Sequence, residues 1–113
     1  MPPYMEKIEK YQAIILNFLQ QYEGEHKDGE TYVLTDTIHH HYQIMRAGWD
    51  NLNHYFLRVR IHLHIKPDGK IWIMENRTED EIAEILVDLG VDKRDIVLAL
   101  LPEHVRELSG YGV

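Results

Sequence analysis

The sequence predicts an α+β fold with an N-terminal helix, an antiparallel sheet of about four strands, and a C-terminal helix followed by a short apolar segment. Three observations support this prediction. Apolar residues recur every three or four positions near the N-terminus, alternate with polar residues through the middle of the chain, and regain helical spacing after Thr78. Repeats and low-complexity linkers are absent, so we expect a single domain covering residues 1–113.

The first helix is expected from Tyr4 onward, because its apolar residues lie three or four positions apart and so share one face: Ile8, Tyr11, Ile15, Phe18 or Leu19, and Tyr22. Gly24 provides a stop near its end. The segment GEHKDGE that follows is interpreted as a polar loop.

Strand-forming residues dominate the next part of the chain, in TYVLTD and HYQIMRAGW, with the turn-prone DNLN after them. A strictly alternating strand comes next, with apolar residues on one side (Val59, Ile61, Leu63, Ile65) and polar residues on the other (Arg58, Arg60, His62, His64, Lys66). Pro67-Asp68-Gly69 predicts a tight turn, after which KIWIM returns as the neighbouring strand.

The C-terminal helix is predicted to start at Thr78, because Glu81 three residues later completes the capping-box pattern. Gly90 is placed to end this helix, and Asp92 to cap one short turn. The segment IVLALL, residues 96–101, is apolar enough to be buried, either as helix or as strand, and Pro102 ends it.

The charge balance restricts the function. Nineteen acidic and twelve basic residues give a net charge of −7, so direct binding to duplex DNA by this chain alone is not expected. The absence of cysteine excludes disulfides and thiolate zinc sites. Neither a signal-peptide pattern nor a long apolar run occurs, so we expect a cytoplasmic protein without a membrane span.

The histidines raise the question of a metal site. In a strand, His39 and His41 point to one side and His40 to the other. If the next hairpin turns near Asn51, paired residue numbers sum to about 103. His41 would then face His62, and His39 would face His64.

Four imidazoles on one face could hold a zinc-type ion, and a metal-dependent hydrolase using His39, His41, His62 and His64 is the alternative function. Otherwise these histidines are the polar side of a strand, and no cofactor is expected. The row from Arg58 to Lys66 is a solvated face, a β-ribbon contact for nucleic acid, or a contact for an acidic partner surface. Trp49 either anchors the hairpin or lies in an interface.

The order of these segments resembles the XisI-like family, named for the excision controlling factor of the cyanobacterial fdxN element. The resemblance is carried by Asp36, HYQ at His41, Gly48-Trp49, the I-H-x-x-I strand at Ile61, GKIWI at Gly69, Thr78-Glu79, Gly90-Val91, DIVL at Asp95, and the Gly-aromatic-x-Val ending at Gly110. The family usually has an acidic residue where this chain has His64, so a four-histidine site would be particular to this member.

The resemblance implies a non-catalytic accessory protein in DNA rearrangement during heterocyst differentiation, working with XisH, a companion whose family is nuclease-like. It implies no catalytic residues. The expected partner-binding residues are Asp36, His41, Trp49 and His62 from the family pattern, with Arg58 and Arg60 added from the charged row. Self-association as a homodimer or higher oligomer is a further expectation.

Overall fold

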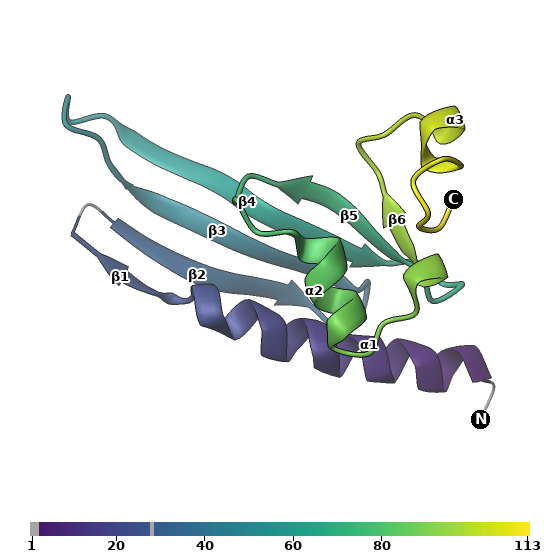
Figure 1. Cartoon of the computed structure of the whole chain (residues 1–113). Coiled ribbons are helices and arrows are strands. Elements are labelled where there is room, and N and C mark those ends of the chain that lie inside the picture. Colours follow the sequence, from purple (N-terminus) through teal and green to yellow (C-terminus); the bar gives the residue numbers. More distant parts are fainter. Residues whose placement is uncertain (1–2, 28) are drawn as a thin grey trace.

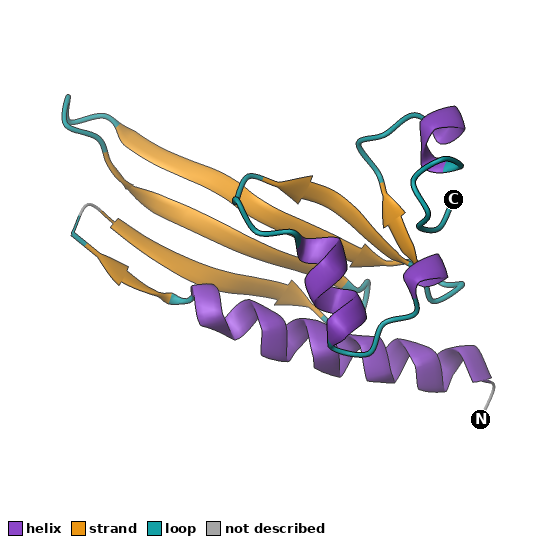
Figure 2. Cartoon of the chain, in the orientation of Figure 1, coloured by secondary structure: helices purple, strands orange, loops and turns teal. Residues whose placement is uncertain are grey.

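The fold was analysed in a computed structural model, which describes residues 3–27 and 29–113. Helices and strands are arranged as Figures 1 and 2 show. In chain order the elements are α1 (Pro3–Leu19), the 3₁₀ turn η1 (Gln20–Tyr22), β1 (Gly24–His26), β2 (Gly29–Asp36), β3 (His41–Trp49), β4 (Tyr55–Ile65), β5 (Ile71–Asn76), α2 (Ile82–Asp88), η2 (Lys93–Asp95), β6 (Ile96–Leu98) and α3 (Glu103–Arg106). This α+β composition confirms the predicted fold class.

The sheet is larger than predicted and is mixed. It has six strands in the order β1-β2-β3-β4-β5-β6, where about four antiparallel strands were expected. The first five strands pair antiparallel, but β6 runs parallel to β5 after a crossover through α2. The two additional strands are three residues each. β1 lies in the segment interpreted as a polar loop, and β6 shows that the start of IVLALL is extended.

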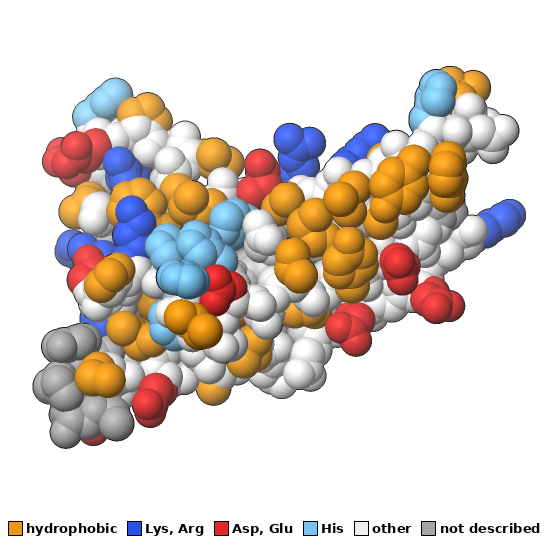
Figure 3. Space-filling view, turned by 180° about the vertical axis from the view of Figure 1, so that it is seen from behind, with side chains coloured by type: hydrophobic (Ala, Val, Ile, Leu, Met, Phe, Trp, Pro, Cys, Tyr) orange, Lys and Arg blue, Asp and Glu red, His pale blue; other side chains and the backbone are white. Residues whose placement is uncertain are grey.

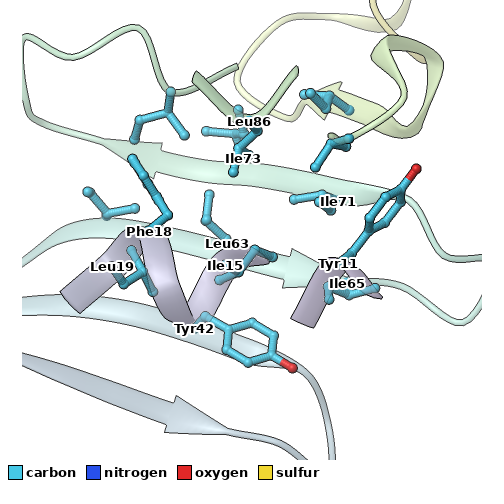
Figure 4. Packing of buried hydrophobic residues seen from close by; sticks show 14 of the residues in the cluster. Tyr11, Ile15, Phe18, Leu19, Tyr42, Leu63, Ile65, Ile71, Ile73 and Leu86 are labelled. Carbon is cyan, nitrogen blue, oxygen red and sulfur yellow. The ribbon is translucent and has the colours of Figure 1, made fainter. Parts of the chain in front are cut away.

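α1 lies across one face of the sheet, as its apolar spacing predicts. Figure 4 shows its buried side chains pointing toward those of the central strands. The core contains Tyr11, Ile15, Phe18 and Leu19 from α1, Tyr42, Ile44, Ile61, Leu63, Ile65, Ile71, Ile73 and Ile96 from the sheet, and Ile82, Leu86 and Val91 from α2 and its end. The sheet face under α1 and α2 is called the covered face below.

The C-terminal helix begins later than the capping box predicted. α2 starts at Ile82, and Glu81 at its N-cap makes no side-chain capping bond. The hydroxyl of Thr78 instead donates to Asn76 Oδ1 at 2.6 Å and accepts from the backbone N–H of Asp80 at 3.2 Å. Because the Thr78 hydroxyl is hydrogen-bonded within this turn, it does not cap α2, and the predicted capping box does not form.

The residues predicted to form the turn after β4 and to end or cap the later helical segments, Gly69, Gly90 and Asp92, do so. Gly69 and Gly90 both have positive φ, 88° and 115°, in the turn after β4 and at the end of α2. The side chain of Asp92 accepts from the backbone N–H of Arg94 and caps η2.

A polar link connects α1 to η2. The Tyr11 hydroxyl donates to Asp95 Oδ2 at 2.6 Å and accepts from the backbone N–H of Asp92 at 3.2 Å. Lys7 Nζ lies 3.4 Å from Asp95 Oδ1. Burial, reinforced by the hydrogen bond to Asp95, raises the pKa of Tyr11 to about 12, so the phenol remains a donor at physiological pH.

The other face of the sheet, called the open face, carries no long helix and is seen in Figure 3. Cross-strand pairing defines it, because opposed residues share a face. Its rows across β2, β3 and β4 are Asp36–His41–His64, Leu34–Gln43–His62, Tyr32–Met45–Val59 and Glu30–Ala47–Leu57, with Trp49 opposite Tyr55. Among the described residues, no helix is long and apolar enough to span a membrane.

Candidate functional site

A β-bulge in β4 decides which side chains reach the open face. Near the turn Met45 pairs with Val59, but Ile44 pairs with Ile61, so Arg60 is an extra residue on β4. The paired numbers sum to 104 on the turn side of the bulge and to 105 beyond it, as Met45↔Val59 and Ile44↔Ile61 show. The predicted sum of about 103 is therefore wrong.

The bulge divides the predicted row of charged residues between the two faces. Arg58 pairs with Arg46 on the covered face, and Arg60 lies with Ile61 opposite Ile44 on that same face. His62 and His64 stay on the open face. Val59, predicted to face the core, lies on the open face instead, because one extra residue reverses the alternation on the turn side.

The three consecutive histidines make three different sets of contacts. His39 lies in the turn after β2, where its Nδ1 contacts Asp36 Oδ2 at 2.8 Å. His40 has a positive φ of 61° and its Nδ1 lies 2.7 Å from the hydroxyl of Tyr42. That hydroxyl donates to Gln12 Oε1, so His40 is the donor to Tyr42. Only His41 enters the strand.

His41 joins His62 and His64 in a cluster on the open face, which we call the histidine cluster. The His41 and His64 rings are stacked, 4.0 Å apart and inclined by 2°. His41 Nδ1 and His62 Nε2 are 2.9 Å apart, so one donates and the other accepts. His64 Nδ1 donates to the carbonyl oxygen of His40 at 3.0 Å. The predicted proximity of His41 and His62 is confirmed, although His41 is paired directly with His64.

The surroundings of His41 and His62 favour their neutral forms. Burial lowers the pKa of His41 and of His62 from the usual 6.5, and the neighbouring histidines lower both further. The Asp36 carboxylate opposes this effect at His41. Asp36 accepts hydrogen bonds from the backbone N–H and ring of His39, which lower the pKa of Asp36 to about 2. Asp36 therefore remains ionised, and its hydrogen bonds are made to the turn that follows β2 and not to the rings of the histidine cluster.

The four-histidine arrangement is not formed. His39 is held by Asp36 in the turn, and no strand pairing brings it opposite His64. Within residues 3–27 and 29–113, no group of three or more histidine, aspartate or glutamate side chains has a metal-binding arrangement. The metal-dependent hydrolase therefore lacks the geometry on which it was based. Beside the cluster is a cavity of about 570 Å³, lined by Met5 and Ile8 of α1 and by Ile38.

An apolar patch covers the end of the open face nearest the β3–β4 turn (Figure 3). Trp49 and Tyr55 are each 58% exposed, and their rings meet edge to face with centroids 5.3 Å apart. The patch consists of Tyr32, Leu34, Met45, Trp49, Tyr55, Leu57 and Val59. A contiguous exposed surface of this composition is typical of a protein–protein contact.

Known proteins resemble this chain in both sequence and fold. The family described as XisI protein matches residues 5–113. The chain belongs to the XisI family. It is similar to the crystal structure of a XisI-like protein from Anabaena variabilis ATCC 29413, with 35% identity, a TM-score of 0.79, and coverage of 97% of this chain and 98% of that one.

A second XisI-family structure shares the fold. The fdxN element excision controlling factor XisI from Anabaena variabilis ATCC 29413 has a TM-score of 0.73 and 24% identity, over 94% of this chain and 97% of that one. No curated protein is significantly similar to the chain.

In this XisI-family fold the expected partner-binding residues fall into three places. Asp36, His41 and His62 lie together at one end of the open face, whereas Trp49 lies in the apolar patch at the other end. Arg58 and Arg60 lie on the covered face. Arg58 stacks on Phe56, with its guanidinium carbon 4.8 Å from the ring centroid. The six residues are therefore not one site.

Sequence reasoning missed most of the apolar patch. Leu34, 50% exposed, lies in the expected strand TYVLTD, and Leu57, 53% exposed, precedes the alternating strand that begins at Arg58; neither is predicted to be a surface contact residue. The sequence signal for the patch is that these strands carry apolar residues at both the even and the odd positions, so that both faces of a strand are apolar. In TYVLTD, Tyr32 and Leu34 alternate with Val33, so β2 is apolar on both faces.

Proposed function

We propose that this XisI-family chain is a non-catalytic accessory protein in site-specific DNA rearrangement, acting in the cytoplasm through a nuclease-like protein partner of the XisH type. Family membership supports the accessory role, and one structural neighbour, from Anabaena variabilis, is an fdxN element excision controlling factor. The observation that carries the proposal is the apolar patch of the open face, where Trp49 and Tyr55 are both more than half exposed.

The patch has the chemistry of an interface centre. Tryptophan and tyrosine bury large areas at a low cost in side-chain entropy, and are enriched among residues that dominate binding energies. The Trp49 and Tyr55 rings already pack edge to face, so a partner would restrict fewer side-chain rotamers and binding would lose less conformational entropy. Leu34 and Leu57 extend the same surface along β2 and β4.

Charge favours a partner that itself holds DNA. Glu30 and Asp36 lie on β2 along the same face as the patch, and the whole chain carries −7. A protein that binds nucleic-acid phosphates presents cationic surface, which attracts an acidic accessory protein and is complementary to it. The proposed division of labour therefore leaves contact with DNA to the partner, and no cofactor is needed by this chain.

The experiment is co-expression with an XisH-type protein from the same genome, followed by size-exclusion chromatography. We expect the two proteins to elute together at micromolar concentration. The double variant Trp49→Ala/Tyr55→Ala is expected to weaken the complex at least about 30-fold, which corresponds to about 2 kcal/mol. Leu108→Ala is the matched control, because Leu108 is 86% exposed and lies outside the patch.

Two outcomes would count against the proposal. Separate elution of the unmodified proteins at micromolar concentration removes the partner. Equal affinity of the double variant and the Leu108 control removes the patch as its docking surface. The competing hypothesis is that the patch mediates self-association, which size-exclusion chromatography of this chain alone tests. A dimer that Trp49→Ala/Tyr55→Ala converts to monomer would show that the patch binds a second copy of the chain.

A further inference from the structure

The covered face contains a pocket just beyond the end of α1. Its cavity volume is about 300 Å³. The central strands form its floor, and the walls come from η1, β1 and the segment between β5 and α2. The polar side chains that line it include Gln21, Tyr22, His26, Thr31, Arg46 and Arg60. None of the described lining residues is acidic, which is unusual in a chain of net charge −7.

Arg60 reaches this pocket because of the bulge. In regular alternation it would lie with His62 on the open face, but the extra residue places Arg60 beside Ile61, opposite Ile44. Its Nε is buried and has no hydrogen-bond partner. Within the part of the chain that the structure describes, the Arg60 side chain makes no ion pair. A guanidinium that is partly desolvated and unpaired gains strongly from an anionic ligand.

The remaining walls supply further donors. His26 Nε2 lies 3.1 Å from Thr31 Oγ1, so this pair is ordered at one side of the pocket. Arg46 also lines the pocket, where its guanidinium lies over Phe56. The nearby Asp80 carboxylate accepts the hydroxyl of Tyr22, and burial together with this bond raises the pKa of Tyr22. The phenol is therefore neutral and adds no negative charge to the pocket.

We propose that this pocket binds a phosphate-type oxyanion through Arg60. A guanidinium presents paired N–H donors that match two oxygens of a phosphate, and this bidentate contact is stronger than a neutral hydrogen bond. A volume of about 300 Å³ accommodates a phosphate group with a small organic substituent. The pocket lies on the opposite face of the sheet from the apolar patch, so this inference is independent of the proposed function.

The test is thermal unfolding of the full chain in sodium phosphate and in sodium chloride at equal ionic strength. We expect phosphate to raise Tm with the logarithmic concentration dependence of a single site, by about 5 °C at ten times Kd. Arg60→Ala should abolish this rise, and Arg60→Lys, which keeps the charge but loses the paired donors, should weaken binding at least about fivefold. Arg58→Ala is the matched control: it removes the same charge two positions away and should retain the full rise.

The controls separate a site from a general salt effect. Phosphate stabilises many proteins by exclusion from their surfaces, which gives a rise that does not depend on any single side chain. An equal rise in the unmodified chain and in Arg60→Ala would overturn the proposal. If Arg60→Ala does not fold, Arg60→Lys carries the same test, and an unchanged Kd for that variant would overturn the bidentate site.

Two further ligands identify the source of the phosphate. Adenosine monophosphate represents a free phosphate ester, and a short DNA duplex represents a polynucleotide backbone. A Tm shift with adenosine monophosphate that depends on Arg60, without a corresponding effect of duplex, supports a small ligand. Binding of duplex that Arg60→Ala abolishes and Arg58→Ala retains supports the same phosphate chemistry in a nucleic acid. Binding of either ligand that is insensitive to Arg60 contradicts the proposal.

Discussion

The covered and open faces belong to the same strands, yet the covered face forms the buried core and the open face exposes apolar side chains. On the covered face, α1 and α2 lie over Ile44, Ile61 and Leu63, which are at most 1% exposed. On the open face, Leu57 of the same strand β4 is 53% exposed. The difference shows that the apolar residues of this sheet exceed what its own helices can cover. The surplus is concentrated at the end near the β3–β4 turn, where a partner can reach it.

The bulge separates the two faces, and deleting residues around it should give the largest effect. Without His62, the strand can keep its pairing on both sides of the bulge only by losing the bulge, which moves Ile61 to the open face and leaves Arg60 alone opposite Ile44. We expect a cost of at least about 3 kcal/mol in the free energy of unfolding, because Ile61, which is 0% exposed, leaves the core and an unpaired charge takes its place. Deleting Arg60 itself removes only the extra residue and should cost less. Urea unfolding of both variants measures the difference, and equal costs would contradict the assigned bulge.

Truncating one leucine on each face of β4 compares the faces directly. Leu63→Ala removes a side chain that is 0% exposed and should lower the free energy of unfolding by about 3 kcal/mol. Leu57→Ala makes the same chemical change on the open face and should cost less than about 1 kcal/mol. Chemical denaturation of the two variants provides the measurement. A loss for Leu57→Ala as large as that for Leu63→Ala would mean that the open face is part of the folding core.

Acidification should produce the smallest of these effects, confined to the histidine end of the open face. The folded-state pKa values of His41 and His62 lie below the usual 6.5, so the unfolded chain binds more protons in that range. The free energy of unfolding should therefore fall as the pH falls from 7 through 6.5 toward the folded-state values. Two protonated rings also cannot share the His41–His62 hydrogen bond.

The matching variant is His62→Gln, which should flatten the pH dependence of the free energy of unfolding between pH 7 and 5. His104→Gln, at an exposed position of α3, should leave the profile as steep as in the unmodified chain. A profile that His62→Gln does not change would show that the histidine cluster carries no pH dependence.

Much of the fold was predictable because burial imposes a period on the sequence. The spacing of Tyr11, Ile15 and Phe18 gave α1, and the alternation from Ile61 to Ile65 gave the end of β4. Turn chemistry was equally direct at Gly69 and Gly90, where positive φ favours glycine.

The site was less predictable, because a bulge leaves no mark in an alternating sequence. Arg58, Arg60 and His62 alternate perfectly with apolar residues, yet the pairing of Val59 and Ile61 with consecutive residues of β3 divides them between the faces. That choice depends on twist and packing across strands. His41 and His62 were nevertheless correctly expected to be neighbours, because a diagonal position across the pair is also within reach of a ring.

Local competition explains the remaining errors. Thr78 and Glu81 match a capping box, but Asn76 lies two residues earlier and takes the hydroxyl of Thr78 for its own turn. β1, Gly24–His26, has only three residues and follows no apolar period, so only its pairing with β2 identifies it as a strand.

The link between Tyr11 and Asp95 also has a consequence for the order in which the molecule is made. The two residues are 84 positions apart, so Tyr11 is synthesised well before its partner exists. At about 5–20 residues per second, that interval lasts roughly 4–17 s. During it, α1 has neither Asp95 nor the core residues of α2 and β6 to pack against. A chain whose synthesis stops before Asp95 therefore exposes a helix-forming apolar segment of the kind that chaperones and proteases recognise.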